Sequence, residues 1–283
     1  MEPGSIFRAG LFADTVVIVS GGGTGIGRAT ARELAALGAT VILCSRAPEH
    51  LEPTVNEIVA AGGRAEARVC NIRDAQAVAA LFDTVAQRHG RIDGLVNNAG
   101  GQFMSPAETI SPKGWHAVVE TNLTGTFYMC QAAYAHGMKE HGGAIVNIVV
   151  ENWRGFPGMS HSGAARAGVV NLTQTLALEW AQHGIRINSV APGIINSSGL
   201  KHYGADVTAR LERVAREVPA GRMGTESEIA AAVIYLLSPA AAFISGTTLR
   251  VDGAGSLYRL QGYVIPEHEP WPAHQVFEAD PDV

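Results

Sequence analysis

A cluster of glycines near the N-terminus has the composition and spacing of a phosphate-binding turn. Residues 20–27 read SGGGTGIG, and three of the glycines give the spacing G-x-x-x-G-x-G. Backbone N–H groups in such a turn, together with the N-terminus of a following helix, bind phosphate oxygens. Glycine suits the position because a Cβ would hold the phosphates away and because the turn requires unusual φ angles.

The segments on both sides of this turn are the ones that a dinucleotide site requires. The apolar, β-branched run Thr15–Val19 predicts a buried strand, and the alanine-rich run Arg28–Leu37 predicts a helix. A plain tight turn is the alternative, but the strand–turn–helix context favours a bound cofactor. The contacts predicted within the turn are Gly21, Gly23, Thr24, Gly25, Ile26 and Gly27.

Strands and helices alternate along the rest of the chain, which predicts an α/β fold. We expect a doubly wound parallel sheet of seven strands, a Rossmann fold, in one domain over residues 1–256. The further strands are expected at 40–44, 65–70, 92–96, 144–150, 185–190 and 247–251. The further helices are expected at 50–61, 74–89, 112–139, 162–183, 206–217 and 226–237. The apolar tail, residues 257–283, is expected to pack on this domain or on a neighbouring subunit.

Composition excludes several classes of protein. The chain has 283 residues with a net charge of −5, which argues against nucleic-acid binding. No apolar run reaches membrane-spanning length, and residues near the N-terminus lack the basic and apolar regions of a signal peptide, so we expect neither a membrane span nor a signal peptide. The cysteines Cys44, Cys70 and Cys130 lack metal-site spacing, so they predict reduced thiols and no bound metal. We therefore expect a soluble, cytoplasmic protein.

The end of the second strand bears on the choice of cofactor. An acid about 20 residues past the glycines usually binds the adenosine ribose, but this strand ends in Ser45-Arg46. Serine and arginine suit a 2′-phosphate, so NADP is favoured over NAD, although Arg46 could also be an ordinary solvated arginine. Further contacts are expected from Asn71 and Ile72 after the third strand and from Asn98, Ala99 and Gly100 after the fourth. The sequence NNAG at 97–100 is also typical of a plain turn.

Four motifs together resemble the short-chain dehydrogenase/reductase family. They are SGGGTGIG at 20–27, NNAG at 97–100, Asn122 in the long helix and APG at 191–193. The resemblance implies a seven-stranded doubly wound sheet and assembly into homodimers or homotetramers. It also implies that Asn122 helps to order a water relay. Four residues after the sixth strand would contact the cofactor: Pro192, Gly193, Ile195 and Ser197.

The chain departs from the family at its catalytic centre, which in the family holds a serine, a tyrosine and a lysine. Aligning Arg166-Ala167-Gly168-Val169 with the usual Lys-Ala-Gly-Val puts Ser162 at the tyrosine position and Arg166 at the lysine position. Val149 or Val150 falls at the serine position, with Glu151 next. Because serine is a poor proton donor, an ordinary carbonyl reduction is disfavoured.

One branch of the family, the enoyl-CoA and 2,4-dienoyl-CoA reductases, shows the same loss. GGQFMSPAE at 100–108, HSGAARAG at 161–168, LLSPAA at 236–241 and Trp271-Pro272 resemble peroxisomal-type trans-2-enoyl-CoA reductases. The resemblance implies NADPH-dependent reduction of the 2,3 double bond of trans-2-enoyl-CoA thioesters. The alternatives are a 2,4-dienoyl-CoA reductase, a dehydrogenase of a terpenoid alcohol or aldehyde, and a non-catalytic NADP-binding protein.

Such a reduction must stabilise an enolate and then supply a proton. Donors to the enolate are expected from Gln102, Asn122 and a ribose hydroxyl held by Arg166. The candidate proton donors are Glu151, if it is partly buried, Tyr203 and water. Tyr203 lies in the segment 194–218, which is expected to cover the substrate. Glu151 could equally be a solvated residue at the end of a strand, and Tyr203 could equally be a loop residue that only packs. Basic residues Lys201, Arg210, Arg213 and Arg216 could meet coenzyme A phosphates or form a solvated face. We expect His161 to be a helix cap or surface group.

Overall fold

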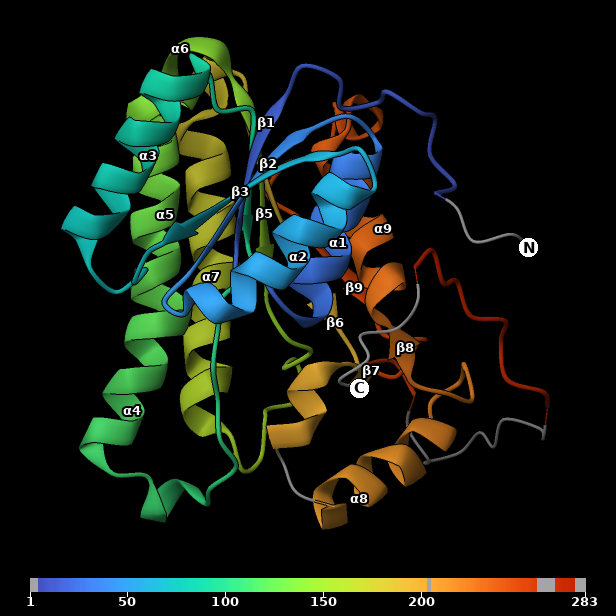
Figure 1. Ribbon diagram of the computed structural model, residues 1–283. Coiled ribbons are helices and arrows are strands. Elements are labelled where there is room, and N and C mark those ends of the chain that lie inside the picture. Colours follow the sequence, from blue (N-terminus) through green and yellow to red (C-terminus); the bar gives the residue numbers. More distant parts are fainter. Residues whose placement is uncertain (1–4, 203–204, 259–267, 278–283) are drawn as a thin grey trace.

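Seven parallel strands form the centre of the computed structural model, which describes residues 5–202, 205–258 and 268–277 (Figure 1). Their order across the sheet is β3-β2-β1-β4-β5-β6-β9. They are β1 (Val16–Ser20), β2 (Thr40–Ser45), β3 (Arg64–Val69), β4 (Gly94–Asn97), β5 (Gly143–Ile148), β6 (Ile185–Pro192) and β9 (Thr248–Val251). The prediction of a doubly wound parallel sheet is confirmed.

Helices cover both faces of this sheet, as Figure 1 shows. One layer contains α1 (Gly25–Ala36), α2 (Pro48–Ala60) and α9 (Glu226–Leu237). The other contains α3 (Ala75–His89), α7 (Ser160–Glu179) and the long helix made of α4 (Pro112–Val119), α5 (Gly125–Ala133) and α6 (Lys139–His141). Buried strand residues such as Val17 and Ile18 point alternately into the two layers, so each layer has its own apolar core.

The strand order reverses at β1, which lies between β2 and β4. Helices leaving these neighbouring strands go to opposite faces, so the carboxyl ends of β1 and β4 border an open crevice. Ser20 and Asn97, the last residues of these two strands, are paired in register. This is the place where an open α/β sheet binds its ligand.

Local sequence signals fix several element ends. Asp74 caps α3, since its side chain accepts the N–H groups of Gln76 and Ala77 at 2.9 and 3.2 Å. Gly90 ends the same helix with φ +74°. The structure thus confirms the helix that the sequence predicts at 74–89. The capping box of α9 joins Thr225 and Glu228.

Some expected boundaries were wrong. α1 begins at Gly25 rather than Arg28 because the phosphate-binding turn is already its first turn, and β5 ends at Ile148 rather than Val150. The segment 194–225 contributes two short paired strands that the sequence did not indicate, β7 (Ile195–Asn196) and β8 (Gly224–Thr225), on either side of α8 (Ala205–Arg216). Single 3₁₀ turns lie at 107–109, 181–183, 198–202 and 239–241.

Residues 268–277 of the tail cross β8 and the N-terminus of α9. Arg222 Nε donates to the Trp271 carbonyl at 2.7 Å, and Thr225 Oγ1 donates to the His274 carbonyl at 2.7 Å. Val276 is buried, and its N–H donates to Ser227. These contacts seat the tail beside the last crossover of the sheet.

Candidate active site

A cleft of about 220 Å³ opens at the carboxyl ends of β1, β2, β3 and β4. Nine residues expected to bind the cofactor line it: Gly21, Thr24, Ser45, Arg46, Asn71, Ile72, Asn98, Ala99 and Gly100. Four residues that the sequence analysis did not single out for the cofactor also line it: Cys44, Cys70, Arg73 and Thr121. Arg73 could have been found, because it follows Asn71-Ile72 directly at the end of β3.

The glycine turn is held in place by hydrogen bonds from the end of β4. Asn98 Nδ2 donates to the carbonyls of Ser20 and Gly21 at 3.1 and 3.0 Å. The Ser20 hydroxyl in turn accepts the N–H groups of Asn98 and Ala99, both at 3.1 Å. Gly21 and Gly25 have φ angles of +64° and +57°, which a residue with a Cβ would adopt only under strain.

The other glycines of the motif allow close packing. A Cβ at Gly27 would collide with the Gly21 carbonyl, and one at Gly23 would collide with the backbone of His50 at the start of α2. Thr54 of α2 also donates to the Gly23 carbonyl at 3.0 Å. Gly23 therefore faces α2 and supports the turn from behind, while Ile26 packs against the apolar core beside α1.

The adenosine end of the cleft contains no carboxylate among its lining residues. The Ser45 hydroxyl donates to the Ala47 carbonyl at 2.8 Å and orders the turn that carries Arg46. Arg46 is exposed and lines the cleft. Asn71 Oδ1 accepts the N–H of Arg73 at 3.3 Å, so this asparagine fixes the next turn of the chain. Ser45 and Arg46 thus stand at the end of β2, where an acid would be expected for a free ribose hydroxyl, and Arg73 lines the same cleft from the segment after β3.

The residues expected after β6 lie apart from this lining. Pro192 ends β6, and the N–H of Gly193 donates to the Val251 carbonyl at 3.0 Å. A Cβ at Gly193 would collide with Asp252, so glycine is required by the neighbouring chain. Ile195 is buried in β7, and Ser197 is partly buried after it.

A second group of polar side chains meets at residues 100–102, directly after β4. Asn122 lies in a π-helical turn, Glu120–Thr124, between α4 and α5. It is fully buried, and its carboxamide both accepts the N–H and donates to the carbonyl of Gly101, each at 2.9 Å. Ser162 is also fully buried, and its hydroxyl donates to Gln102 Oε1 at 2.7 Å.

Arg166 reaches the same loop from α7. Only 7% of its surface is exposed, and its Nη1 donates to the Ile148 carbonyl at the end of β5. A Cβ at Gly100 would collide with its guanidinium, so this glycine makes room for the arginine. Within the described ranges no carboxylate forms an ion pair with Arg166, and Nε has no hydrogen-bond partner. Burial lowers the pKa of Arg166 to about 10, so the side chain remains a cation at neutral pH.

Glu151 follows β5 and is half-buried. Its Oε1 is sealed from solvent and has no hydrogen-bond partner among the residues that the structure describes. Val149, one of the two residues expected at the family's serine position, is buried in a small apolar cluster with Val169 and Ala191, and Val150, the other of the two, is partly buried. Tyr203, the other side chain expected to supply a proton, lies outside the described residues.

Of the two expectations for His161, a helix cap or a surface group, the second was wrong. It is fully buried, with Phe103 against its ring at 4.3 Å between centroids and an interplanar angle of 82°. Its Nδ1 accepts the N–H of Ser162 at 2.8 Å, which ties the first turn of α7 together. Burial lowers the pKa of His161, against a smaller opposing effect from the Met159 backbone. The sequence gave no sign of burial because polar and small residues surround the histidine.

This burial predicts a pH-dependent stability. Between the lowered pKa and the ordinary value of 6.5 the unfolded chain binds a proton that the folded chain does not. The contribution of His161 is therefore complete above pH 6.5 and is lost as the pH falls below it. Urea unfolding at pH 7.5 and 5.0 should show a smaller drop in the free energy of unfolding for His161→Gln than for the wild type. The exposed His141→Gln should keep the wild-type dependence, and an equal drop in all three proteins would contradict this account.

A family model described as enoyl-(acyl carrier protein) reductase matches residues 21–255. The chain belongs to the short-chain dehydrogenase/reductase family, whose members bind a nicotinamide dinucleotide. Its homologues and structural neighbours are oxidoreductases, so the crevice at β1 is the candidate active site of an oxidoreductase.

Individual relatives share most of the length of this chain. A probable 2,4-dienoyl-CoA reductase of Bacillus subtilis is 40% identical over 240 residues, covering 84% of this chain and 94% of the relative. The peroxisomal 2,4-dienoyl-CoA reductase of Rattus norvegicus is 36% identical over 88% of this chain and 86% of the relative. Among solved structures, the citronellol catabolism dehydrogenase of Pseudomonas aeruginosa is 48% identical with a TM-score of 0.81, covering 89% of this chain and 99% of that one.

The described residues include no helix that is both long and apolar enough to cross a membrane. They also contain no group of three or more His, Cys, Asp or Glu side chains arranged to hold a metal ion. All three cysteines are free and buried. Burial raises the pKa of Cys70 to about 11 and that of Cys130 to about 12, so these thiols are protonated at neutral pH.

Proposed function

We propose that this protein reduces the 2,3 double bond of trans-2-enoyl-CoA thioesters with NADPH. The observation that carries the proposal is the pair Ser162–Gln102 beside the buried Arg166, in place of the family's tyrosine and lysine. A ketone reduction needs an acid at position 162 to protonate an alkoxide, and a serine that donates to Gln102 is not such an acid. Reduction of an activated C=C bond instead needs donors to an enolate oxygen, which the site can offer.

Several observations favour a bound nicotinamide dinucleotide. The glycine turn has the required positive φ angles, the cleft lies at the strand-order reversal, and Arg166 has a buried Nε without a partner in the described chain. The cofactor supplies a hydride to the β-carbon of the substrate. Ser45 and Arg46 would bind the 2′-phosphate of NADP, and Arg166 would hold the nicotinamide ribose hydroxyls.

Side chains of the protein would then stabilise the negative charge of the enolate and supply the proton. As the β-carbon gains a hydride, the electrons of the double bond move to the thioester oxygen and form an enolate. The hydrogen bond from Ser162 to Gln102 Oε1 orders the carboxamide of Gln102, and an amide N–H of this residue would donate to the enolate oxygen. The Asn122 carboxamide fixes the loop through both of its bonds to Gly101, so this side chain would also position Gln102.

The enolate must finally be protonated at the α-carbon, and we propose Glu151 as the donor. Its half-buried carboxyl follows β5 and has an oxygen sealed from solvent. Glu151→Gln should lower kcat about 10²- to 10⁴-fold, because glutamine has no proton to donate. The dissociation constant of NADPH should not change. The exposed Glu217→Gln serves as the control, and an unchanged kcat in Glu151→Gln would assign the proton to Tyr203 or to water.

A 2,4-dienoyl-CoA thioester is the second candidate substrate, favoured by the names of the Bacillus and rat relatives. The same donors would serve it, because reduction also places negative charge on the thioester oxygen. The third is a terpenoid alcohol or aldehyde, from the name of the Pseudomonas neighbour. The fourth candidate function has no substrate: the protein would bind NADP without catalysing a reaction.

One assay separates these candidates. NADPH oxidation is followed at 340 nm with trans-2-enoyl-CoA and 2,4-dienoyl-CoA thioesters, and NADP reduction with citronellol. Faster turnover of the monoenoyl thioester supports the proposal, and faster turnover of the dienoyl thioester moves the function to the second candidate. Turnover of citronellol alone overturns both, and tight NADPH binding without turnover supports the non-catalytic protein.

Assembly and location are further parts of the proposal. The resemblance to the family favours a homodimer or homotetramer. Exposed apolar side chains on α5 and α7, Phe127 and Leu178, are suited to an interface between copies.

Free cysteines suit a reducing compartment such as the cytoplasm. Arg213 and Arg216 of α8 are exposed and could meet coenzyme A phosphates.

A further inference from the structure

Arg222 lies at the end of the segment between β7 and β8, and it takes no part in the steps above. Every N–H of its guanidinium has an acceptor. Nη1 and Nη2 donate to the two oxygens of Glu228 at 2.9 and 2.6 Å, and Nη1 also donates to the Met223 carbonyl at 2.8 Å. The remaining donors reach the tail, where Nε donates to the Trp271 carbonyl at 2.7 Å and Nη2 to the Pro272 carbonyl at 3.0 Å. Because the guanidinium is a rigid fork with five donors, these bonds fix three parts of the chain in one geometry.

The Glu228 carboxylate extends this junction to the first turn of α9. It accepts the N–H of Thr225 at 2.8 Å, which is one half of the capping box, and the N–H of His274 at 3.3 Å. The Thr225 hydroxyl donates to the His274 carbonyl at 2.7 Å. Only 22% of the Arg222 side chain and 20% of the Glu228 side chain are exposed, so water and salt screen this ion pair less than a surface pair.

Residues 268–277 form a C-terminal strap that is anchored on both sides of this junction. On one side, the N–H of Trp271 donates to the Ala220 carbonyl at 3.0 Å. On the other side, Val276 is buried, and the centre of the Phe277 ring lies 4.4 Å from Cζ of Arg32 in α1. The strap thus connects the end of the segment between β7 and β8 to the helix that follows the glycine turn.

The two ends of this segment meet at β7 and β8, which form its base, and the base stands beside the glycine turn. The two strands pair in parallel, and the N–H of Gly224 donates to the Ile194 carbonyl at 2.9 Å. Ser198 follows β7 closely, and a Cβ at Gly25 would lie 3.4 Å from its hydroxyl oxygen. Gly25 is the first residue of α1, where the cofactor phosphates are expected. Ser198 would therefore stand beside the phosphates, on a backbone whose base the junction fixes.

We propose that Arg222 is a positioning residue that, through Glu228 and the C-terminal strap, holds this base against the glycine turn and so helps to retain the cofactor. The residues beyond the base belong to the segment expected to cover the substrate, so the junction would also help to retain the substrate. The effect on the substrate rests on the proposed function. The effect on the cofactor rests only on the dinucleotide binding of the family.

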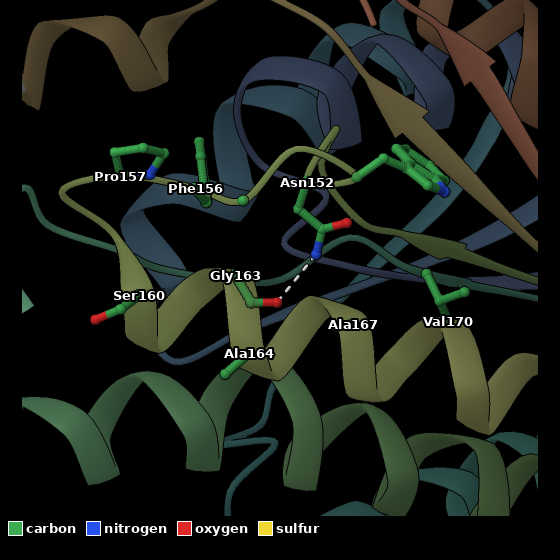
Figure 2. A pocket seen from close by; sticks show the side chains of 10 residues that line it. Asn152, Phe156, Pro157, Ser160, Gly163, Ala164, Ala167 and Val170 are labelled. Atoms are coloured by element: carbon green, nitrogen blue, oxygen red, sulfur yellow. Dashed lines mark hydrogen bonds between the residues drawn. The ribbon is translucent and has the colours of Figure 1, made fainter.

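Other contacts hold the side chains of the proposed reaction centre. Asn152 Nδ2 donates to the Gly163 carbonyl in the first turn of α7 at 3.0 Å. Figure 2 shows this bond as a dashed line, at an uncharged cleft between α7 and the loop 152–157. Ser162, the residue before Gly163, donates to Gln102. Neither bond involves Arg222 or the strap, so loosening the strap should weaken the retention of ligands and leave kcat nearly unchanged.

Arg222→Gln should raise the dissociation constants of NADPH and NADH by the same factor, about tenfold, because it removes the ion pair and the bonds to the strap. The factor is the same because both coenzymes have the same diphosphate. KM for a trans-2-enoyl-CoA thioester should rise as well, while kcat stays within about twofold. Arg222→Lys keeps a charge beside Glu228 and should lose only about threefold. The matched control is Arg91→Gln, which removes the ion pair with Asp93 at the amino end of β4 and should change none of these constants.

Val276→Asp tests the strap and leaves both members of the ion pair in place. It puts a charge into the buried site of Val276 and should release the strap there. The dissociation constants of both coenzymes should rise about threefold to tenfold, and the change should be smaller in the Arg222→Gln background, because both substitutions act through one strap. Hydrogen exchange of the amides at 219–228 should become faster. Ala273→Asp adds the same charge at an exposed position of the strap and should have none of these effects.

The outcomes separate this inference from the proposed function. Unchanged dissociation constants in both Arg222→Gln and Val276→Asp, with only a lower melting temperature, would overturn the inference and make the junction purely structural. A loss of kcat larger than the change in the dissociation constants would also overturn it, because it would assign Arg222 to the chemical step. Weaker binding of both coenzymes without any turnover of an enoyl-CoA thioester by the wild type would support the inference and count against the proposed function.

Discussion

Arg166→Met is expected to lower kcat/KM with NADPH about 10²- to 10³-fold, the usual effect of removing a preorganised charged donor from an active site. The guanidinium is buried, close to Gly100, and without an ion pair in the described chain, so its charge is available to the ribose and to the enolate. Arg166→Lys keeps the charge in the form that the family uses and should lose only about tenfold. Steady-state kinetics of both variants with an enoyl-CoA thioester give the comparison.

Arg186 provides a matched control. It is also an arginine of the core region that donates to backbone carbonyls, here those of Leu236, Leu237 and Ser238 at the end of α9. Arg186→Met should lower the free energy of unfolding by about 1–3 kcal/mol and leave kcat/KM near the wild-type value. Arg166→Met should lower kcat/KM but should not lower the free energy of unfolding, because it removes a buried cation that has no ion pair and whose desolvation is costly. A loss of stability without a loss of activity in Arg166→Met would make this arginine a purely structural residue.

Arg46→Ala is expected to raise KM for NADPH about 10- to 100-fold, the effect of losing a hydrogen-bonded charge. KM for NADH should stay within about twofold, because NADH has no 2′-phosphate for the arginine to bind. Ser45→Asp should lower KM for NADH, since an acid at the end of β2 can accept hydrogen bonds from the ribose hydroxyls. The same acid repels the 2′-phosphate of NADPH. Coenzyme titrations of each variant measure the ratio of the two KM values.

The exposed Arg88→Ala in α3, which removes the same charge away from the cleft, is the control for long-range electrostatics. It should leave both KM values unchanged at moderate salt, where distant surface charges are screened. If Arg46→Ala raised KM equally for NADPH and NADH, Arg46 would order the loop and would not bind the 2′-phosphate. The choice of NADP would then fall to Arg73, the other arginine that lines the cleft.

Much of the fold followed from the sequence because its signals are local. Alternating β-branched runs and helical runs give the parallel sheet, and Asp74 and Gly90 mark the ends of α3. The cofactor cleft could be predicted for a related reason. Its residues all come from the turns directly after β1, β2, β3 and β4, and the carboxyl ends of parallel strands meet at one edge.

The reaction centre was harder to predict because its contacts join segments far apart in the chain. The sequence placed Gln102, Ser162 and Arg166 near a common site, but it did not show that Ser162 donates to Gln102 or that Arg166 lies against Gly100. The burial of His161 was missed for the same reason. Its neighbours in sequence are polar and small, and the apolar contact comes from Phe103, 58 positions earlier (161 − 103).

The sequence by itself determined the family, the order of strands and helices along the chain and most residues that line the cleft at the strand-order reversal, because each depends on short motifs and on the period of apolar residues. Only the tertiary structure decided how those residues act. It showed that Gly23 faces α2, that Asn122 is committed to Gly101, and that the loop 152–157 and α7 enclose an uncharged cleft. Burial and long-range hydrogen bonding are properties of the packed chain, so no local pattern of residues could have supplied them.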